Sequence, residues 1–211
     1  MTDIQGYVLA GGLSSRMGRP KADIVLGRKT LLERAVATMT DFTGSAPAVV
    51  LRSLQNIPFR VPRRIETIED EAGDKDPRAP IFGVRAALKH CKTDWMAVLA
   101  VDHPFVTVAL FKQLAAARDA TVDAVVAMQP DGTPQVLCAL YRCAPIIREI
   151  EQGLGRGDLS VRGALPPGRT LLLKPDLPPN GICPVSNLNT PAELLEAERS
   201  LRQMPPQPNI E

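Results

Sequence analysis

A glycine-rich, basic segment near the N-terminus is the strongest chemical signal in this chain of 211 residues. It runs from Leu9 to Lys21 as LAGGLSSRMGRPK, directly after an apolar stretch that begins at Gly6. Glycines let backbone N–H groups approach an anion closely, because no Cβ stands in the way. The part of the chain from 16 to 29 holds five basic residues and one acid, Asp23. The segment therefore predicts a loop that binds the phosphate groups of a ligand.

The spacing within this segment excludes two common phosphate-binding loops. A P-loop needs lysine directly after its last glycine and then a hydroxyl residue, whereas two residues separate Gly18 from Lys21 and no hydroxyl follows. A dinucleotide-binding fingerprint needs Gly-x-Gly-x-x-Gly, whereas Gly11 and Gly12 are adjacent. The structural alternative to a binding loop is a solvated basic turn after an edge strand.

A second candidate is Asp102, which directly follows the apolar run 95–101. Open α/β sheets bind ligands at the carboxyl ends of their strands. Magnesium is held by one or two carboxylates together with phosphate oxygens and water, so one aspartate beside a triphosphate is enough. Position alone does not decide between a metal ligand and a residue that caps the turn before Pro104; the presence of a phosphate-binding loop in the same chain favours Asp102 as a metal ligand. The neighbouring His103 is interpreted as a turn residue rather than a ligand or base.

Apolar periodicity and the placement of proline predict the elements that position these residues. The expected strands cover 6–9, 48–51, 64–68, 95–101, 122–128, 135–141 and 170–174. Capping boxes at Thr30 and Thr190 predict the starts of two helices, and further helices are expected at 81–91, 108–120, 145–152 and 158–165. The polar segment 69–78 is predicted to be a mobile loop over the site. The alternation predicts an α/β fold of three layers, Rossmann-like, with a mostly parallel central sheet and helices on both faces.

Composition narrows the class of protein. The chain is 45% hydrophobic and 23% charged, with a net charge of +2 and few aromatic residues, which argues against nucleic acid as a partner. We expect one domain over 1–203 with a frayed tail over 204–211. The N-terminus does not resemble a signal peptide and no apolar run approaches a membrane span, so a cytoplasmic protein without a membrane partner is predicted. No Cys-x-x-Cys pair occurs, and the four cysteines are interpreted as buried free thiols: Cys91, Cys138, Cys143 and Cys183.

The glycine-rich segment resembles the signature loop of the nucleotidyltransferases that activate sugars, terpenoid precursors and molybdopterin. Three further blocks narrow the resemblance to the molybdenum cofactor guanylyltransferases and extend it over nearly the whole chain. They are PIFG at 80–83, VDHPF at 101–105 and NLNTPAEL at 187–194. Leu-Ala-Gly-Gly, in place of Leu-Ala-Ala-Gly, resembles the guanylyl branch rather than the related cytidylyltransferases.

The resemblance implies transfer of GMP from MgGTP to the terminal phosphate of the molybdopterin cofactor, with release of pyrophosphate. The implied nucleotide-binding residues are Leu9, Ala10, Gly11, Gly12, Lys21, Asp70, Gly83 and Asp102. Arg16, Lys21 and Asp102 form the implied catalytic set, Asp70 recognises guanine, and Asp102 holds Mg²⁺, with Mn²⁺ as an alternative. Asn187 and Asn189 are implied to face the acceptor. GTP and molybdopterin are the implied substrates, and proteins that deliver molybdopterin or mature molybdoenzymes are the implied partners.

Two departures from the family pattern touch the expected nucleotide pocket. The chain has APIFG at 79–83 where the family often has Gly-Pro-Leu-Ala-Gly, so the bulky Phe82 is expected to reshape the pocket. At 51–53 it has Leu-Arg-Ser, where the family commonly has an asparagine near the base. A cytidylyl- or sugar-nucleotidyltransferase and a non-catalytic nucleotide-binding regulator stay open as alternatives. A dinucleotide oxidoreductase is disfavoured by the glycine spacing.

Overall fold

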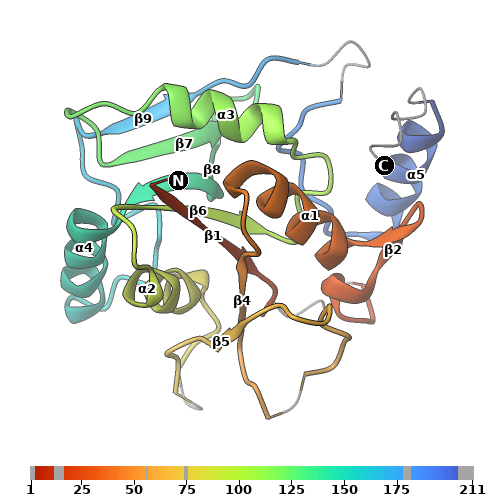
Figure 1. Ribbon diagram of the computed structural model, residues 1–211, viewed down its shortest axis with the longest axis horizontal. Coiled ribbons are helices and arrows are strands. Elements are labelled where there is room, and N and C mark those ends of the chain that lie inside the picture. Colours follow the sequence, from red (N-terminus) through yellow and green to blue (C-terminus); the bar gives the residue numbers. More distant parts are fainter. Residues whose placement is uncertain (1–2, 12–16, 56, 74–75, 178–181, 204–211) are drawn as a thin grey trace.

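A seven-stranded mixed sheet forms the centre of the computed structural model, in the order β5-β4-β1-β6-β8-β7-β9 (Figure 1). The structure describes residues 3–11, 17–55, 57–73, 76–177 and 182–203. The strands are β1 (Ile4–Leu9), β4 (Ala48–Leu51), β5 (Thr67–Glu69), β6 (Trp95–Ala100), β7 (Ala124–Met128), β8 (Pro134–Arg142) and β9 (Thr170–Leu173). A separate two-stranded ribbon consists of β2 (Val25–Leu26) and β3 (Lys29–Thr30).

The direction of the strands confirms the predicted mostly parallel sheet, with one strand reversed. Four of the six pairings in the large sheet are parallel, and β8 runs antiparallel to both β6 and β7. The reversal follows from a short connection: the Gln129 N–H donates to the Thr133 carbonyl at 2.9 Å, and Gly132 supplies the positive φ that the turn needs. A connection of this length can join only antiparallel neighbours.

Helices cover both faces of the sheet, as predicted. The helices are α1 (Leu31–Thr43), α2 (Pro80–His90), α3 (Val108–Ala116), α4 (Cys143–Gly155) and α5 (Pro191–Gln203), with a 3₁₀ turn, η1, at Lys21–Asp23. One core cluster joins α1 and α3 to the sheet, and a second joins α2 and α4 to its other face. Successive residues of β6 alternate between the two clusters, because side chains along a strand point to opposite faces. The strand is therefore buried on both sides, which explains its continuous apolar sequence.

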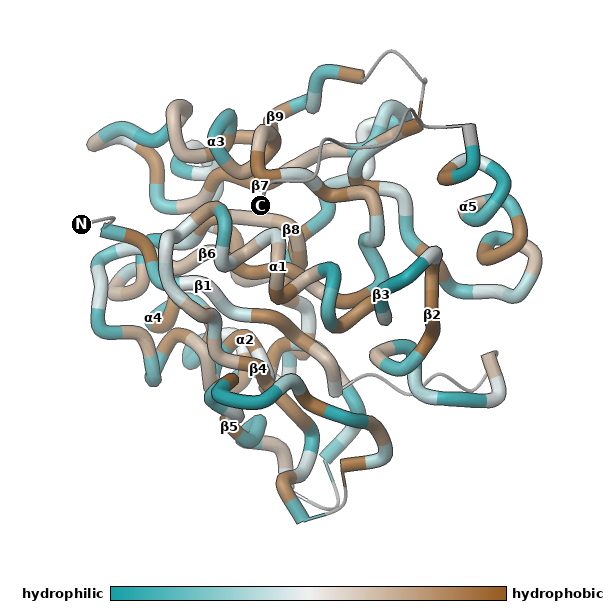
Figure 2. Tube along the Cα trace, turned by 45° about the vertical axis from the view of Figure 1, so that its right-hand side comes forward, coloured by the Kyte–Doolittle hydropathy of each residue, from teal (hydrophilic) through white to brown (hydrophobic). Residues whose placement is uncertain are grey.

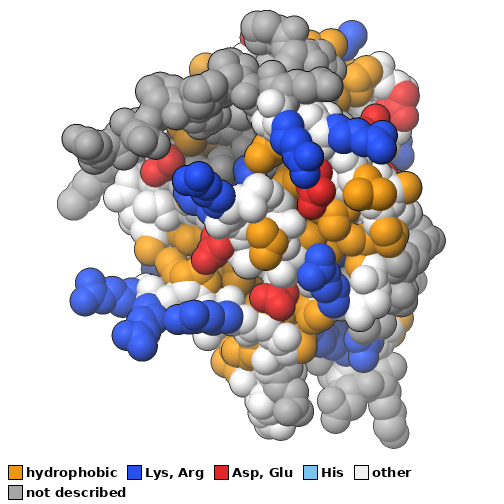
Figure 3. Space-filling view, turned by 90° about the vertical axis from the view of Figure 1, so that its right-hand side faces the viewer, with side chains coloured by type: hydrophobic (Ala, Val, Ile, Leu, Met, Phe, Trp, Pro, Cys, Tyr) orange, Lys and Arg blue, Asp and Glu red, His pale blue; other side chains and the backbone are white. Residues whose placement is uncertain are grey.

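The last helix, α5, packs beside the β2–β3 ribbon rather than on the large sheet (Figure 1). Hydrophobic residues alternate with hydrophilic ones along it (Figure 2), and Ala197 is buried against the core. Figure 3 shows the face that carries this region, where Lys and Arg side chains are spread out with acidic side chains between several of them. Within the described part of the chain, none of the helices combines the length and apolar character needed to cross a bilayer.

Both predicted capping boxes are present. The Thr30 hydroxyl accepts from the Glu33 N–H at 3.1 Å, and the Glu33 carboxylate accepts from the Thr30 N–H at 2.8 Å. Thr190 and Glu193 make the same reciprocal pair at the start of α5. These contacts satisfy N–H groups that a helix start otherwise leaves unpaired, which is why a four-residue pattern was enough to place both helices.

The predicted helix at 158–165 is wrong: this stretch forms turns. The Asp158 carboxylate accepts from the Ser160 N–H at 2.9 Å, and the Ser160 hydroxyl accepts from the Gly163 N–H at 3.0 Å. Such local side-chain bonds compete with helical ones and favour turns. The strand predicted at 64–68 is shorter and lies later, at 67–69, after Arg64, whose φ of 67° interrupts an extended chain.

Candidate functional site

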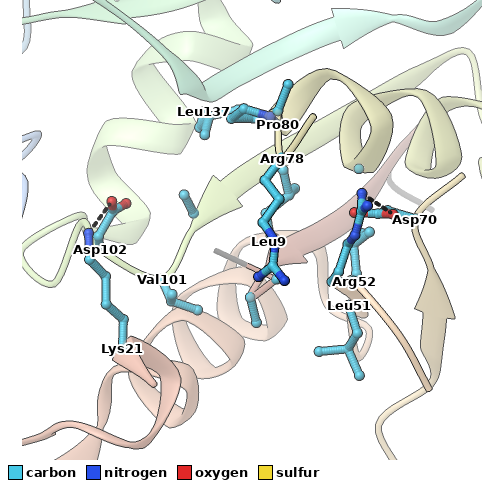
Figure 4. Close-up of a pocket in the computed structure, with 16 residues that line it drawn as sticks. Leu9, Lys21, Leu51, Arg52, Asp70, Arg78, Pro80, Val101, Asp102 and Leu137 are labelled. Carbon is cyan, nitrogen blue, oxygen red and sulfur yellow. Dashed lines mark hydrogen bonds and ion pairs between the residues drawn. The ribbon is translucent and has the colours of Figure 1, made fainter. Parts of the chain in front are cut away.

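A cavity of about 370 Å³ opens at the carboxyl ends of β1, β4 and β6. Its volume lies within the range typical of small-molecule sites. The lining residues come from the ends of these strands, from η1, from the start of α2 and from β8: Leu9, Ala10, Gly11, Lys21, Val50, Leu51, Arg52, Asp70, Arg78, Ala79, Pro80, Gly83, Ala100, Val101, Asp102 and Leu137. Figure 4 shows an ion pair on each side of this pocket.

The first ion pair joins Lys21 to Asp102. The Lys21 Nζ lies 3.0 Å from the Asp102 Oδ2 and donates a hydrogen bond of 2.6 Å to the Asn189 Oδ1. Lys21 begins η1, Asp102 follows β6, and Asn189 precedes α5, so three segments distant in sequence converge. The Leu188 N–H donates to the Asp102 carbonyl at 2.8 Å, which holds the last segment against the end of β6. The ammonium is thus fixed by two side chains.

The second ion pair lies at the other side and joins Arg52 to Asp70. The Arg52 Nη1 is 3.4 Å from the Asp70 Oδ1, and the Ala72 N–H donates to the same oxygen at 3.1 Å. Asp70 is placed by β5, because its N–H donates to the Leu51 carbonyl of β4 at 2.7 Å. Burial raises the pKa of Asp70 and outweighs the lowering by the Ala72 N–H and by Arg52. The surroundings of this carboxylate therefore stabilise its charge less well than water does.

Two glycines line the pocket walls, and one of them, Gly11, is required by close packing. A Cβ on Gly11 would lie 2.8 Å from the Arg52 backbone nitrogen, so the end of β1 could not approach β4 in this way with a larger residue. A Cβ on Gly83 would lie 3.4 Å from the Leu9 Cδ2. Phe82 does not line the pocket: it is buried in the core on the α2 side of the sheet. The expectation that it reshapes the pocket is therefore wrong.

Comparison with known proteins identifies the family. Residues 6–165 match the MobA-like NTP transferase domain. The chain belongs to this family. It is 35% identical over 75% of its length to a probable molybdenum cofactor guanylyltransferase of Opitutus terrae, of which the match covers 76%. It is 32% identical over 96% of its length to the molybdenum cofactor guanylyltransferase of Rhodobacter capsulatus, of which the match covers 99%.

A solved structure supports the same fold. Molybdopterin-guanine dinucleotide biosynthesis protein A of Archaeoglobus fulgidus superposes with a TM-score of 0.74 and 23% identity, covering 95% of this chain and all of that one. The nucleotidyltransferase fold and enzyme class expected from the signature loop are thereby confirmed.

The pocket of this NTP transferase contains most of the residues that the sequence singled out. Those that line it are Leu9, Ala10, Gly11, Lys21, Asp70, Gly83 and Asp102. Asn189 contacts Lys21, whereas Asn187 is exposed and is not among the lining residues. Gly12 and Arg16 lie outside the described residues. The roles assigned to all of these side chains stay predictions.

His103 has a structural position next to Asp102. It is buried, and its Nδ1 donates to the Val185 carbonyl at 3.2 Å, which links the end of β6 to the segment before α5. Burial lowers the pKa of His103 below its ordinary value. Its bond to a main-chain carbonyl and its absence from the residues that line the pocket agree with its interpretation as a structural residue rather than a ligand or base.

The sequence reasoning missed two basic residues of the pocket. Arg52 was noted only as a departure from the family pattern, and Arg78 was not noted at all. Both line the cavity. The available signal was position: Arg52 directly follows a buried strand, and Arg78 lies just before Pro80, which starts a helix. Residues at such boundaries often face the ligand sites of α/β proteins.

Metal binding in this NTP transferase would depend on few protein ligands. The described residues contain no group of three or more His, Cys, Asp or Glu side chains able to enclose a metal ion. Among its described residues the pocket has two carboxylates, and Asp102, the one beside Lys21, suits Mg²⁺, which can take its other ligands from phosphate oxygens and water. The donor set fits an ion that arrives with a nucleotide.

The cysteines stand apart from this pocket. Cys138 is buried, whereas Cys91, Cys143 and Cys183 are half-buried, so burial was predicted correctly for Cys138 alone. All four are free thiols.

Proposed function

We propose that this chain transfers GMP from GTP to the terminal phosphate of molybdopterin, forming the guanine dinucleotide form of the cofactor and releasing pyrophosphate. The observation that carries the proposal is that one pocket has Lys21 and Asp102 on one side and Asp70 on the other. The names of the two curated relatives support the guanylyl group and the acceptor.

We assign the guanine base to the Asp70 side of the pocket. Guanine presents N1–H and N2–H₂ donors on one edge, and a carboxylate is a pure acceptor of hydrogen bonds. The Asp70 Oδ1 accepts from Ala72 and Arg52, so the Oδ2 is the oxygen assigned to guanine. Leu9, Ala10 and Gly83 would line the base and ribose, and a Cβ on Gly83 would be in van der Waals contact with Leu9.

We assign the phosphates to the Lys21 side. In the reaction a terminal phosphate oxygen of molybdopterin forms a bond to the α-phosphorus of GTP, and the bond from the α-phosphorus to the bridging oxygen of pyrophosphate breaks. Pyrophosphate leaves with the electron pair of that bond, so negative charge builds up on the leaving group. Lys21, backbone N–H groups near Gly11 and, as a further proposal, Arg16 would stabilise that charge. No covalent enzyme intermediate is needed.

The ammonium of Lys21 is positioned before a nucleotide binds. Its contacts at 3.0 Å with Asp102 and 2.6 Å with Asn189 hold it at the pocket wall. A group that is already positioned loses little freedom when the reaction occurs, which lowers the barrier. Asn189 would in addition face the phosphate of the acceptor, and Asn187 is a second candidate for this contact.

Nucleotidyltransferases generally use a divalent metal ion, and we propose Mg²⁺, with Mn²⁺ as an alternative, at Asp102. When bound, the ion would neutralise phosphate charge and make the α-phosphorus more electrophilic. Proteins that deliver molybdopterin or receive the finished cofactor would be the partners of such an enzyme.

The test is a comparison of GTP, CTP, UTP and ATP as stabilising ligands, with and without Mg²⁺, followed by assay of pyrophosphate release with molybdopterin. A ligand at about 100 times its Kd raises the free energy of unfolding by about 2.7 kcal/mol. We expect the largest magnesium-dependent rise with GTP, and pyrophosphate release with GTP and molybdopterin together. A larger rise with CTP or UTP would assign the chain to the cytidylyl or sugar enzymes. GTP binding without pyrophosphate release would make it a regulator.

A further inference from the structure

Arg78 differs in its contacts from the other charged residues of the pocket. Lys21 is paired with Asp102 at 3.0 Å, and Arg52 with Asp70 at 3.4 Å. Across the described part of the chain, no carboxylate lies within ion-pair distance of Arg78, which is exposed and lines the same cavity. Figure 4 shows its side chain between the two ion pairs. The described lining residues therefore leave one positive charge without a counter-ion, and it comes from Arg78.

The backbone on both sides of Arg78 is held in place. The Arg52 Nη2 donates to the carbonyls of Gly73 at 2.9 Å and Asp76 at 3.4 Å. The Asp76 carboxylate accepts from the Gly73 N–H at 2.7 Å, and the Asp76 N–H donates to the Gly73 carbonyl at 3.0 Å. On the other side, Pro80 is the first residue of α2, and its ring fixes φ. Arg78 is thus joined by short links to two anchored points, which keeps it at the pocket.

We infer that Arg78 binds the phosphate chain of the nucleotide substrate together with the groups assigned to it above, and that it adds to the preference of this site for a triphosphate over a nucleoside. The inference rests on the proposed function only in that the pocket takes a nucleotide, and it does not depend on which base is bound. A guanidinium donates two parallel hydrogen bonds to phosphate oxygens, which a compact ammonium cannot do. An exposed, unpaired cation also attracts an anion before contact and loses no ion pair on binding.

The experiment measures the affinity of the wild type, Arg78→Ala, Arg78→Lys and Arg162→Ala by calorimetry in the presence of Mg²⁺. Each is titrated with the nucleoside triphosphate that stabilises the wild type most, and with the corresponding nucleoside. Arg162 is the matched control, because it is an exposed arginine in the turns after α4 and does not line the pocket.

For Arg78→Ala we expect triphosphate binding to be about tenfold to hundredfold weaker, because a hydrogen bond to a charged group is lost. Nucleoside affinity should not change. Arg78→Lys should recover part of the loss, since it restores the charge without the paired donors. Triphosphate binding by the alanine variant should also depend less on salt. Arg162→Ala should behave as the wild type, and thermal unfolding without ligand should agree among all four proteins because both arginines are exposed.

Each outcome decides a separate question. Unchanged triphosphate affinity in Arg78→Ala overturns the inference, and so does an equal loss for triphosphate and nucleoside, which would place Arg78 on the base. Preference of the wild type for CTP or UTP contradicts the proposed guanylyl transfer, while Arg78 is still tested with that nucleotide. If the wild type binds no triphosphate, the proposed function and the inference both fail.

Discussion

The two ends of the central strands, called here the carboxyl edge and the amino edge of the sheet, each hold an aspartate–arginine pair, and the pKa of the aspartate is shifted in opposite directions in the two pairs. At the carboxyl edge, Asp70 makes one contact of 3.4 Å with Arg52, and burial raises its pKa. At the amino edge, Asp123 precedes β7 and both of its oxygens accept from Arg169, with Nη2 to Oδ1 at 2.9 Å. This hydrogen bonding with Arg169 holds the pKa of Asp123 below its usual range. The protein thus stabilises the ionised form of Asp123 better than water does, and it stabilises the ionised form of Asp70 less well than water does.

The difference separates a structural pair from a pair that suits a ligand. Arg169 precedes β9, so its bond to Asp123 ties together two neighbouring strands at the edge of the sheet. Arg142 adds a third contact, with its Nε 3.7 Å from the Asp123 Oδ1. Asp70 lines a cavity and has one oxygen engaged by two donors. Carboxylates with perturbed pKa values in a cleft are typical of functional sites.

If the carboxyl edge is the site of chemistry, the largest expected effect is the loss of turnover in Lys21→Ala. Because Lys21 would stabilise charge on the leaving pyrophosphate, we expect turnover to fall by about 10²- to 10³-fold. The free energy of unfolding should fall by a much smaller factor than turnover, because Asp102 and Asn189 lose a donor but stay partly exposed to water. The measurement is steady-state pyrophosphate release together with denaturant unfolding.

Lys112→Ala is the matched control for this variant, because Lys112 is an exposed lysine on α3, away from the pocket. It should keep wild-type turnover. Wild-type turnover in Lys21→Ala would instead show that Lys21 only holds Asp102 and Asn189 together, and the carboxyl edge would lose its assignment as the site of chemistry.

Asp70→Asn should weaken GTP binding by about tenfold to hundredfold, because the amide replaces an acceptor by a donor that faces the donors of guanine. Its effect on stability should be small or favourable at pH 7. The raised pKa means that ionised Asp70 destabilises the folded state above that pKa, and this cost disappears as pH falls toward the ordinary value for aspartate. Calorimetric titration with GTP and denaturant unfolding at pH 7 and pH 4 measure both effects.

The control for Asp70 is Glu69→Gln, which removes the neighbouring, exposed carboxylate that does not line the pocket. It should leave GTP affinity as it is. Unchanged GTP affinity in Asp70→Asn would contradict the assignment of the base to this side of the pocket. A clear loss of stability at pH 7 would show that the pair with Arg52 is structural, like that of Asp123.

Local signals in the sequence predicted much of the fold. The capping boxes at Thr30 and Thr190 depend on contacts three residues apart, and β4 is a short apolar run whose bounds were predicted correctly at 48–51. The proximity of Lys21 to Asp102 also followed from the sequence, although 81 positions separate them. Parallel strands place their carboxyl ends at one edge of a sheet, so residues that follow β1 and β6 meet there.

Features that depend on tertiary contacts could not be predicted in this way. The reversal of β8 is a different case, because Pro130-Asp131-Gly132 was a local signal of a tight turn that the sequence analysis did not use. Arg78 reaches the pocket because Arg52 holds Gly73 and Asp76, a set of contacts that spans 21 and 24 positions and follows no periodic pattern. At 158–165, apolar spacing suggested a helix, but bonds from Asp158 and Ser160 stabilise turns. Side chains that bind backbone groups in loops are therefore the main source of the errors.

The smallest predicted effect is that of Asp123→Asn, which tests the amino edge. We expect a loss of about 1 kcal/mol in the free energy of unfolding at pH 7, since solvent screens the half-exposed Arg169, and no change in turnover. Because the folded-state pKa of Asp123 is lowered, its contribution is present above the ordinary pKa of aspartate and is lost as pH falls through the folded-state value. The difference from the wild type should therefore be full at pH 7 and shrink below about pH 4.

Urea unfolding at several pH values measures this difference, with Asp41→Asn, an exposed aspartate on α1, as the control that should show none. Loss of turnover in Asp123→Asn at unchanged stability would contradict the division between the two edges. The reason is physical. The Asp123 carboxylate is buried, hydrogen-bonded through both oxygens to Arg169, and absent from the residues that line the pocket. Its removal can therefore alter catalysis only by loosening β7 and β9, and loosening these strands must lower the stability of the fold.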